Sequence, residues 1–131
     1  MRYGLDRREP PVLRHIVWLG NSKRNLQEFP DGVKKLLGDE LQFIQFGGMP
    51  KDVKPFKAVG SGVLEIALRH SSGAYRVVLA VQIGTRIYVL HAFQKKSKRG
   101  VETPKRDVEL IRQRYAEAKE LVYEHEKAKA N

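Results

Sequence analysis

The sequence predicts a small α+β domain, because segments with helical periodicity and segments with strand-like alternation occur together in one chain of 131 residues. That length suits one domain with its own core and is short for two. Hydrophobic residues make up 41% of the chain, which is typical of a globular protein. We therefore expect a single domain over residues 1–131, with flexible ends at 1–13 and 124–131.

The first half of the chain predicts one strand and two helices. Residues 15–19 form an apolar run that ends in the turn-forming string Gly20-Asn21-Ser22, which predicts a strand. Asn21 or Ser22 then caps a short helix, and Asp31 caps a longer one that ends at Gly47-Gly48. The longer helix has apolar residues at helical spacing: Val33, Leu36, Leu37, Leu41 and Ile44.

The second half predicts three strands and one helix. After a loop at 49–62, strands at 63–69, 75–82 and 85–93 are separated by short turns, which favours an antiparallel meander. Thr103-Pro104 begins an amphipathic helix. The expected order is β-α-α-β-β-β-α, with the helices packed on one face of the sheet.

Charge is the most informative part of the composition. The chain has 25 Lys and Arg against 15 Asp and Glu, a net charge of +10, and half of that excess lies in residues 93–106. Such a balance favours a nucleic acid or an acidic protein as partner. The chain has no Cys, which excludes disulfides, thiolate metal sites and a cysteine nucleophile. No signal peptide or membrane span is apparent, so we expect a cytoplasmic protein without membrane partner, cofactor or metal.

Basic residues near the strand ends are the candidate site. If the strands pair through the turn at Ser72-Gly73, Arg69 and Arg76 share the open face of the sheet, opposite the helices. His91 lies beside the basic segment and has an imidazole suited to proton transfer near neutral pH. RNA cleavage needs a base, an acid and positive charge on the phosphate, which Arg, Lys and His supply. The candidate catalytic residues are therefore Arg76, His91 and Arg69, and the candidate RNA-binding residues are Lys54, Lys57, Lys95, Lys96, Lys98 and Arg99.

Two of these residues also have purely structural interpretations. Arg76 lies within a strand and has Glu65 within reach as an ion-pair partner. His91 is equally consistent with a hydrogen-bonded histidine of the core.

Several strings resemble the phage-derived HigB-like branch of the RelE/ParE toxin superfamily, over residues 14 to about 125. They are Trp18-Leu19-Gly20-Asn21-Ser22, Lys54-Pro55-Phe56-Lys57, Gly60 to Glu65, Tyr75-Arg76-Val77, Val89-Leu90-His91-Ala92-Phe93-Gln94-Lys95-Lys96-Ser97, and Thr103-Pro104. The resemblance implies a type II toxin whose RelE-like fold supports ribosome-associated mRNA cleavage, inhibition of translation and growth arrest. It also implies a cognate helix-turn-helix antitoxin, with which the toxin binds operator DNA.

The resemblance assigns roles to particular positions. Arg76 matches a position that contacts the scissile phosphate, and Lys95 and Lys96 match a phosphate-binding segment. Two lysines that RelE has on the preceding strand correspond to Glu65 and Ala67 here. A tyrosine that follows the basic loop in RelE has no counterpart either. His91 and Glu65 are therefore the alternative acid–base candidates.

Three functions remain open at this point. The first is a metal-independent mRNA interferase, that is, an endoribonuclease. The second is a ParE-like poison of DNA gyrase without nuclease activity. The third is a binding module for nucleic acid or protein that has no activity of its own.

Overall fold

A computed structural model describes residues 13–71, 73–95 and 103–130 of the chain. Its elements are β1 (Ile16–Trp18), α1 (Ser22–Gln27), α2 (Asp31–Gln45), β2 (Val53–Pro55), β3 (Val63–His70), β4 (Gly73–Ala80), β5 (Ile87–Lys95) and α3 (Lys105–Ala130). The predicted α+β class is confirmed. The order contains one additional short strand, β2, within the segment that the sequence predicts as a loop.

The strands form one mixed sheet in the order β1-β5-β4-β3-β2. Strands β2 to β5 pair antiparallel in sequence order, as the predicted meander requires, and β1 joins the edge parallel to β5. Residues 19–86 separate β1 from β5 in the chain, so this parallel pairing is a long-range contact that local patterns do not reveal.

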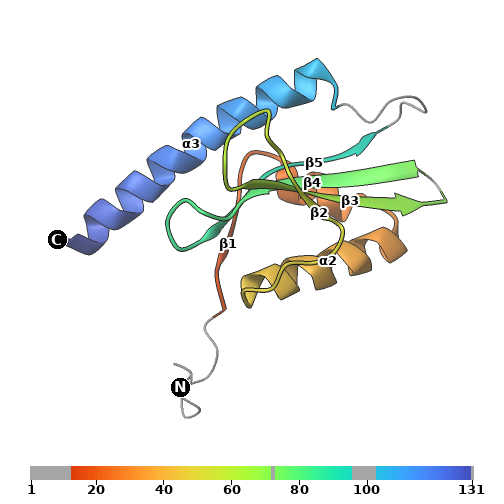
Figure 1. Ribbon diagram of the computed structural model, residues 1–131, viewed down its shortest axis with the longest axis horizontal. Coiled ribbons are helices and arrows are strands. Elements are labelled where there is room, and N and C mark those ends of the chain that lie inside the picture. Colours follow the sequence, from red (N-terminus) through yellow and green to blue (C-terminus); the bar gives the residue numbers. More distant parts are fainter. Residues whose placement is uncertain (1–12, 72, 96–102, 131) are drawn as a thin grey trace, which may run out of the picture.

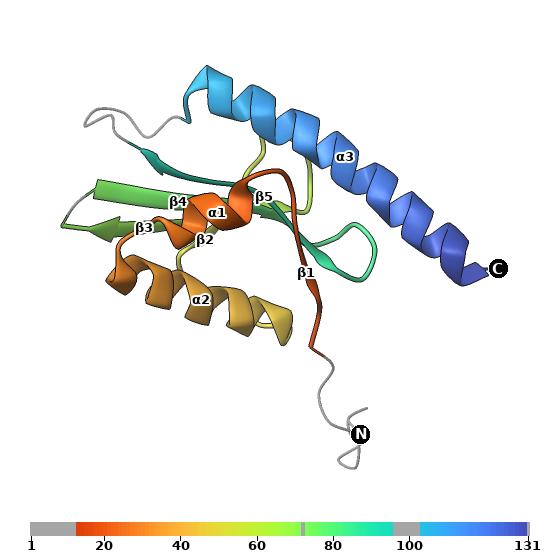
Figure 2. The same ribbon diagram turned by 180° about the vertical axis from the view of Figure 1, so that it is seen from behind.

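The helices cover both faces of the sheet, so the prediction that they pack on one face is wrong. Helices α1 and α2 lie on one face and α3 lies on the other (Figures 1 and 2). Leu37 of α2 packs with Val77 and Val89, whereas Ile111 of α3 packs with Val78. The amphipathic pattern of a helix shows which side is buried, and it does not show which face of a sheet buries it.

The strands at the centre of the sheet explain the two-sided covering. Residues 77–80 of β4 and 87–92 of β5 are all buried, so side chains on both faces of these strands lie within apolar surroundings. Continuous apolar runs of this kind are typical of strands covered on both faces.

Two helix starts differ in detail from the expected caps. Asn21 occupies the N-cap position of α1 without a capping side-chain hydrogen bond, and Pro30 precedes α2 at its N-cap. The last helix starts at Lys105, and the Pro104 carbonyl accepts the first bonds, from the Asp107 and Val108 amides.

Within the described ranges, no helix combines the length and the apolar composition needed to cross a membrane.

Candidate functional site

The register of the strands brings most of the candidate residues to the face that α3 covers in part. Lys54 pairs with Glu65, and Arg76 pairs with both Ala67 and Phe93 across its two neighbouring strands. Directly paired residues in antiparallel strands have their side chains on the same face. One further row contains Arg69, Ala74 and Lys95. Arg69 and Arg76 therefore share one face, as predicted, but that face is not open, because α3 packs on part of it.

Arg76 and Glu65 form a partly buried ion pair on this face. Arg76 Nη1 donates to Glu65 Oε2 at 2.8 Å, and the two side chains are only 13% and 10% exposed. Removing one partner of such a pair leaves an uncompensated charge in a poorly solvated place. Arg76 thus forms the ion pair with Glu65 that its structural interpretation predicts, and its guanidinium holds the Glu65 carboxylate.

His91 lies on the same face, opposite Val78, and contacts α3 through Asp107. His91 Nε2 and Asp107 Oδ1 are 2.8 Å apart, with side chains 6% and 19% exposed. The imidazole also stacks on Phe93, with ring centroids 4.7 Å apart and planes at 15°. Burial lowers the pKa of His91, against the hydrogen bond and the charge of Asp107, which raise it, and Arg114 lowers it further. The ring is therefore neutral near pH 7, and its Nε2–H donates to Asp107.

A break in strand register places His91 on this face. The pairing of β4 with β5 shifts between Val78 and Leu79, so Val78 pairs with His91 while Leu79 pairs with Val89. Leu90 lies in the extra position, and it packs in the same apolar cluster as Ile111 of α3. A bulge of this kind re-aims side chains and interrupts the ladder of backbone hydrogen bonds.

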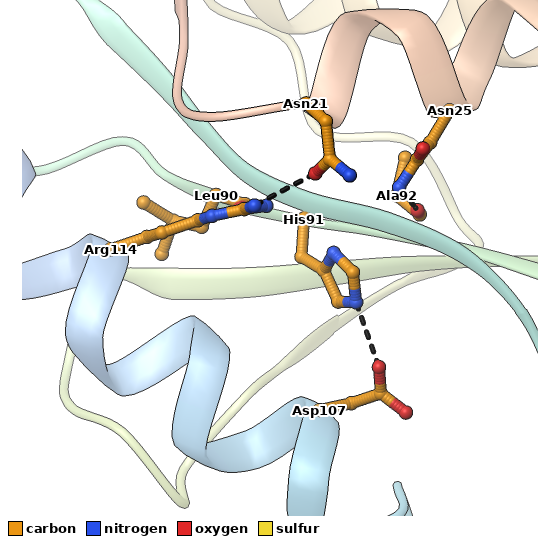
Figure 3. Close-up of polar contacts among 7 residues, drawn as sticks. All are labelled: Asn21, Asn25, Leu90, His91, Ala92, Asp107 and Arg114. Carbon is orange, nitrogen blue, oxygen red and sulfur yellow. Dashed lines mark hydrogen bonds and ion pairs between the residues drawn. The ribbon is translucent and has the colours of Figure 1, made fainter.

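Side chains from α1 and α3 bind the carbonyl groups of β5 around this bulge (Figure 3). Arg114 Nη1 donates to the Leu90 carbonyl at 3.0 Å, and Arg114 Nη2 donates to Asn21 Oδ1 at 2.7 Å. Asn25 Nδ2 donates to the Ala92 carbonyl at 3.1 Å, and Ser22 Oγ donates to the Val89 carbonyl at 3.3 Å. These bonds satisfy backbone groups beside the bulge and fix β5, and with it His91, between the two helices.

Gly20 allows Arg114 to reach this position. The residue has a φ of +53°, and a Cβ atom built there would lie 2.5 Å from Arg114 Nη2. A side chain at this position would therefore be strained and would also collide with the guanidinium. The glycine and asparagine of the string Trp18-Leu19-Gly20-Asn21-Ser22 thus serve to seat an arginine that lies more than 90 residues later in the chain.

The remaining candidate residues differ in accessibility. Lys54, Lys57 and Arg69 are exposed, whereas Lys95 is buried. Lys57 lies in the loop between β2 and β3. Lys96, Lys98 and Arg99 lie outside the described residues.

Three residues of the site were not identified from the sequence: Asp107, Arg114 and Asn25. Asp107 and Arg114 look like ordinary charged residues of an amphipathic helix, and only their burial against β5 distinguishes them. In the described part of the chain, no three His, Asp or Glu residues are grouped as metal ligands.

The arrangement combines two chemical capabilities on one face. Exposed cations from β2 and β3 suit the binding of a phosphate backbone. A neutral histidine hydrogen-bonded to a carboxylate suits the movement of a proton.

Comparison with known proteins places the chain in a family. The family model described as phage-derived protein Gp49-like (DUF891) matches residues 24–116. A search of curated proteins finds no match. Among solved structures, the toxin–antitoxin complex RelBE2 from Mycobacterium tuberculosis aligns with a TM-score of 0.45 and 15% identity, over 66% of this chain and 95% of that chain. The matched family segment runs from α1 into α3 and contains strands β2 to β5, the bulge and both α3 residues of the site. The chain belongs to the family of phage-derived Gp49-like proteins.

Proposed function

We propose that the chain is the toxin of a type II toxin–antitoxin system and that it acts as an endoribonuclease on mRNA. The observation that carries this proposal is the convergence on one sheet face of cationic side chains and a neutral histidine–carboxylate pair. Membership of the Gp49-like family and the resemblance of the His91 to Ser97 string to HigB-like toxins support it.

The cations of this face form the RNA-binding part of the proposed site. Lys54 and Arg69 on this face are exposed, as is Lys57 in the loop between β2 and β3, and we assign all three to contacts with phosphates. Arg76 and Lys95 lie deeper on the same face and add positive charge close to the scissile phosphate. Contacts of this type position the nucleic acid without reading its sequence, and they weaken as the salt concentration rises.

The pair formed by His91 and Asp107 is the proton-handling part. Cleavage by the neighbouring 2′-hydroxyl requires removal of its proton while positive charge stabilises the phosphoryl oxygens. The hydrogen bond of 2.8 Å links the pair, and the face around it supplies the charge. Proton transfer by a positioned side chain contributes about 10²- to 10⁴-fold to such a reaction.

The proposed biology follows from the resemblance. The toxin acts in the cytoplasm on mRNA at the ribosome, and a cognate helix-turn-helix antitoxin neutralises it and carries the complex to operator DNA. The net charge of +10 favours binding to negatively charged surfaces, both of the RNA and of the antitoxin.

Brief induced expression in a bacterial host tests this function. Protein, RNA and DNA synthesis are followed by pulse-labelling, and new mRNA 5′ ends are mapped. We expect an early collapse of translation together with new mRNA ends. His91→Ala and Arg76→Ala are expected to abolish both effects, and circular dichroism and thermal melting of the purified variants establish that they fold.

His15→Ala is the matched control, because His15 is exposed and lies before β1, at the edge of the sheet. It is expected to arrest growth as the wild type does. Toxicity retained in both His91→Ala and Arg76→Ala contradicts the proposed chemistry. Early loss of DNA synthesis with intact mRNA instead indicates a gyrase poison, and unchanged growth with folded protein indicates a binding module.

A further inference from the structure

The two members of the proton-handling pair differ in how a substrate can reach them. The His91 side chain is 6% exposed, and its Nε2 is engaged by Asp107. Its Nδ1 is buried and has no hydrogen-bond partner among the described residues. Phe93 stacks against one face of the ring. Neither nitrogen is placed to meet a ribose hydroxyl directly.

Asp107 lies at the outer side of the pair. Its side chain is 19% exposed, about three times the fraction of His91, and it projects from the first turn of α3. Figure 3 shows that one carboxylate oxygen accepts the hydrogen bond from His91 while the other points away from the ring. Glu65, a carboxylate of β3 on this face of the sheet, is 10% exposed and is engaged by Arg76.

The histidine orients this carboxylate without neutralising it. Because burial lowers the pKa of His91, the ring donates its hydrogen bond as a neutral group and brings no positive charge to Asp107. Asp107 and Arg114, both from α3, are the charged groups that act on the pKa of the ring. On the same face of the sheet, Arg76 lies on the adjacent strand β4, Glu65 on β3 beyond it, and Lys95 further along β5. Arg114 is directed to the Leu90 carbonyl and to Asn21, so it does not compete with His91 for Asp107.

We infer that Asp107 is the catalytic base of the proposed nuclease and that His91 is its positioning residue. This inference rests on the proposed function and names the group that touches the RNA. The outer oxygen of Asp107 takes the proton of a 2′-hydroxyl, and the 2′-oxygen forms a bond to the adjacent phosphorus. The bond from phosphorus to the 5′-oxygen breaks, and water gives a proton to that oxygen. The products are a 2′,3′-cyclic phosphate and a 5′-hydroxyl end, and the carboxyl proton returns to solvent.

Two substitutions separate the roles of the pair. Asp107→Asn keeps the shape and the acceptor oxygen for His91 but is no longer a base. His91→Gln keeps an N–H close to the position of Nε2 and so still donates to Asp107, but it has no group that titrates near neutral pH. Asp107→Glu keeps the base with an altered reach. Glu109→Gln is the matched control, because Glu109 is exposed in the adjoining turn of α3.

The assay measures mRNA cleavage in cells after induction, with the chemical nature of the new 5′ ends and the melting temperature of each purified variant. We expect Asp107→Asn to lose about 10²-fold or more of the cleavage, Asp107→Glu to recover part of it, and Glu109→Gln to match the wild type. His91→Gln is expected to retain most of the cleavage, whereas His91→Ala loses it because the carboxylate is no longer oriented.

Each other outcome overturns the assignment. If folded His91→Gln is as inactive as His91→Ala, then His91 itself exchanges the proton. If folded Asp107→Asn cleaves normally, Asp107 is not the base. A wild-type protein that leaves all RNA intact overturns the proposed function, and the assignment of Asp107 with it.

Discussion

Replacement of Arg114 by alanine tests whether the buried guanidinium of this residue fixes α3 to the sheet. Arg114 is 9% exposed and donates to the Leu90 carbonyl at 3.0 Å and to Asn21 Oδ1 at 2.7 Å. A hydrogen bond from a charged donor contributes about 1.5–3 kcal/mol, and an acceptor left without a partner costs about 1–3 kcal/mol. Removal of the buried charge offsets part of this loss, since burial also lowers the pKa of Arg114.

The net expectation is a loss of about 3 kcal/mol in the free energy of unfolding, which for a domain of this size lowers the melting temperature by roughly 10 °C. Urea denaturation at pH 7 and calorimetry measure both quantities. Arg112→Ala is the matched control, because Arg112 lies in the same helix and is exposed. Arg114→Lys keeps the charge but loses the planar fork, so we expect an intermediate loss.

A double-mutant cycle with Asn21→Ala isolates the contact between the two side chains. We expect a coupling energy of about 1 kcal/mol, because the residues are in direct contact. If Arg114→Ala changes stability by no more than Arg112→Ala does, within about 0.5 kcal/mol, the guanidinium does not fix α3 to the sheet.

Three further predictions concern stability. Gly20→Ala should cost more than about 1 kcal/mol in unfolding free energy, because it combines a φ of +53° with a collision against Arg114. In an Arg114→Ala background the collision part of this cost should disappear and the backbone part should remain; an unchanged cost would show that the collision contributes nothing. Burial and Asp52 raise the pKa of Glu40 above 4.5, so ionisation of Glu40 weakens the fold as pH rises through that value. Glu40→Gln should therefore gain stability over the wild type between pH 4 and 7 in urea titrations, and parallel curves would contradict this. Burial lowers the pKa of His91 below 6.5, so the wild type should lose stability as pH falls below 6.5, and His91→Gln should lose less.

Local patterns in the sequence are sufficient to find most of the elements. The spacing of Val33, Leu37, Leu41 and Ile44 identifies α2, because a helix buries residues three and four apart. The short turn at 71–73 places Arg69 and Arg76 on one face, because a tight hairpin fixes the register of its strands. Strand β2 is absent from the prediction because it has three residues and contains Pro55, which is typical of an edge strand.

The fold class, the antiparallel meander and the clustering of positive charge are thus predictable from the sequence, since each depends on residues that are near one another in the chain. The tertiary structure was needed to show that α3 covers the opposite face from α2, and that β1 pairs with β5. It was also needed to show that His91 forms a hydrogen bond with Asp107, sixteen residues later, and that Arg114 forms one with Asn21, 93 positions earlier. These contacts depend on the bulge in β5 and on the packing of α3, which arise from interactions between segments that are distant in sequence.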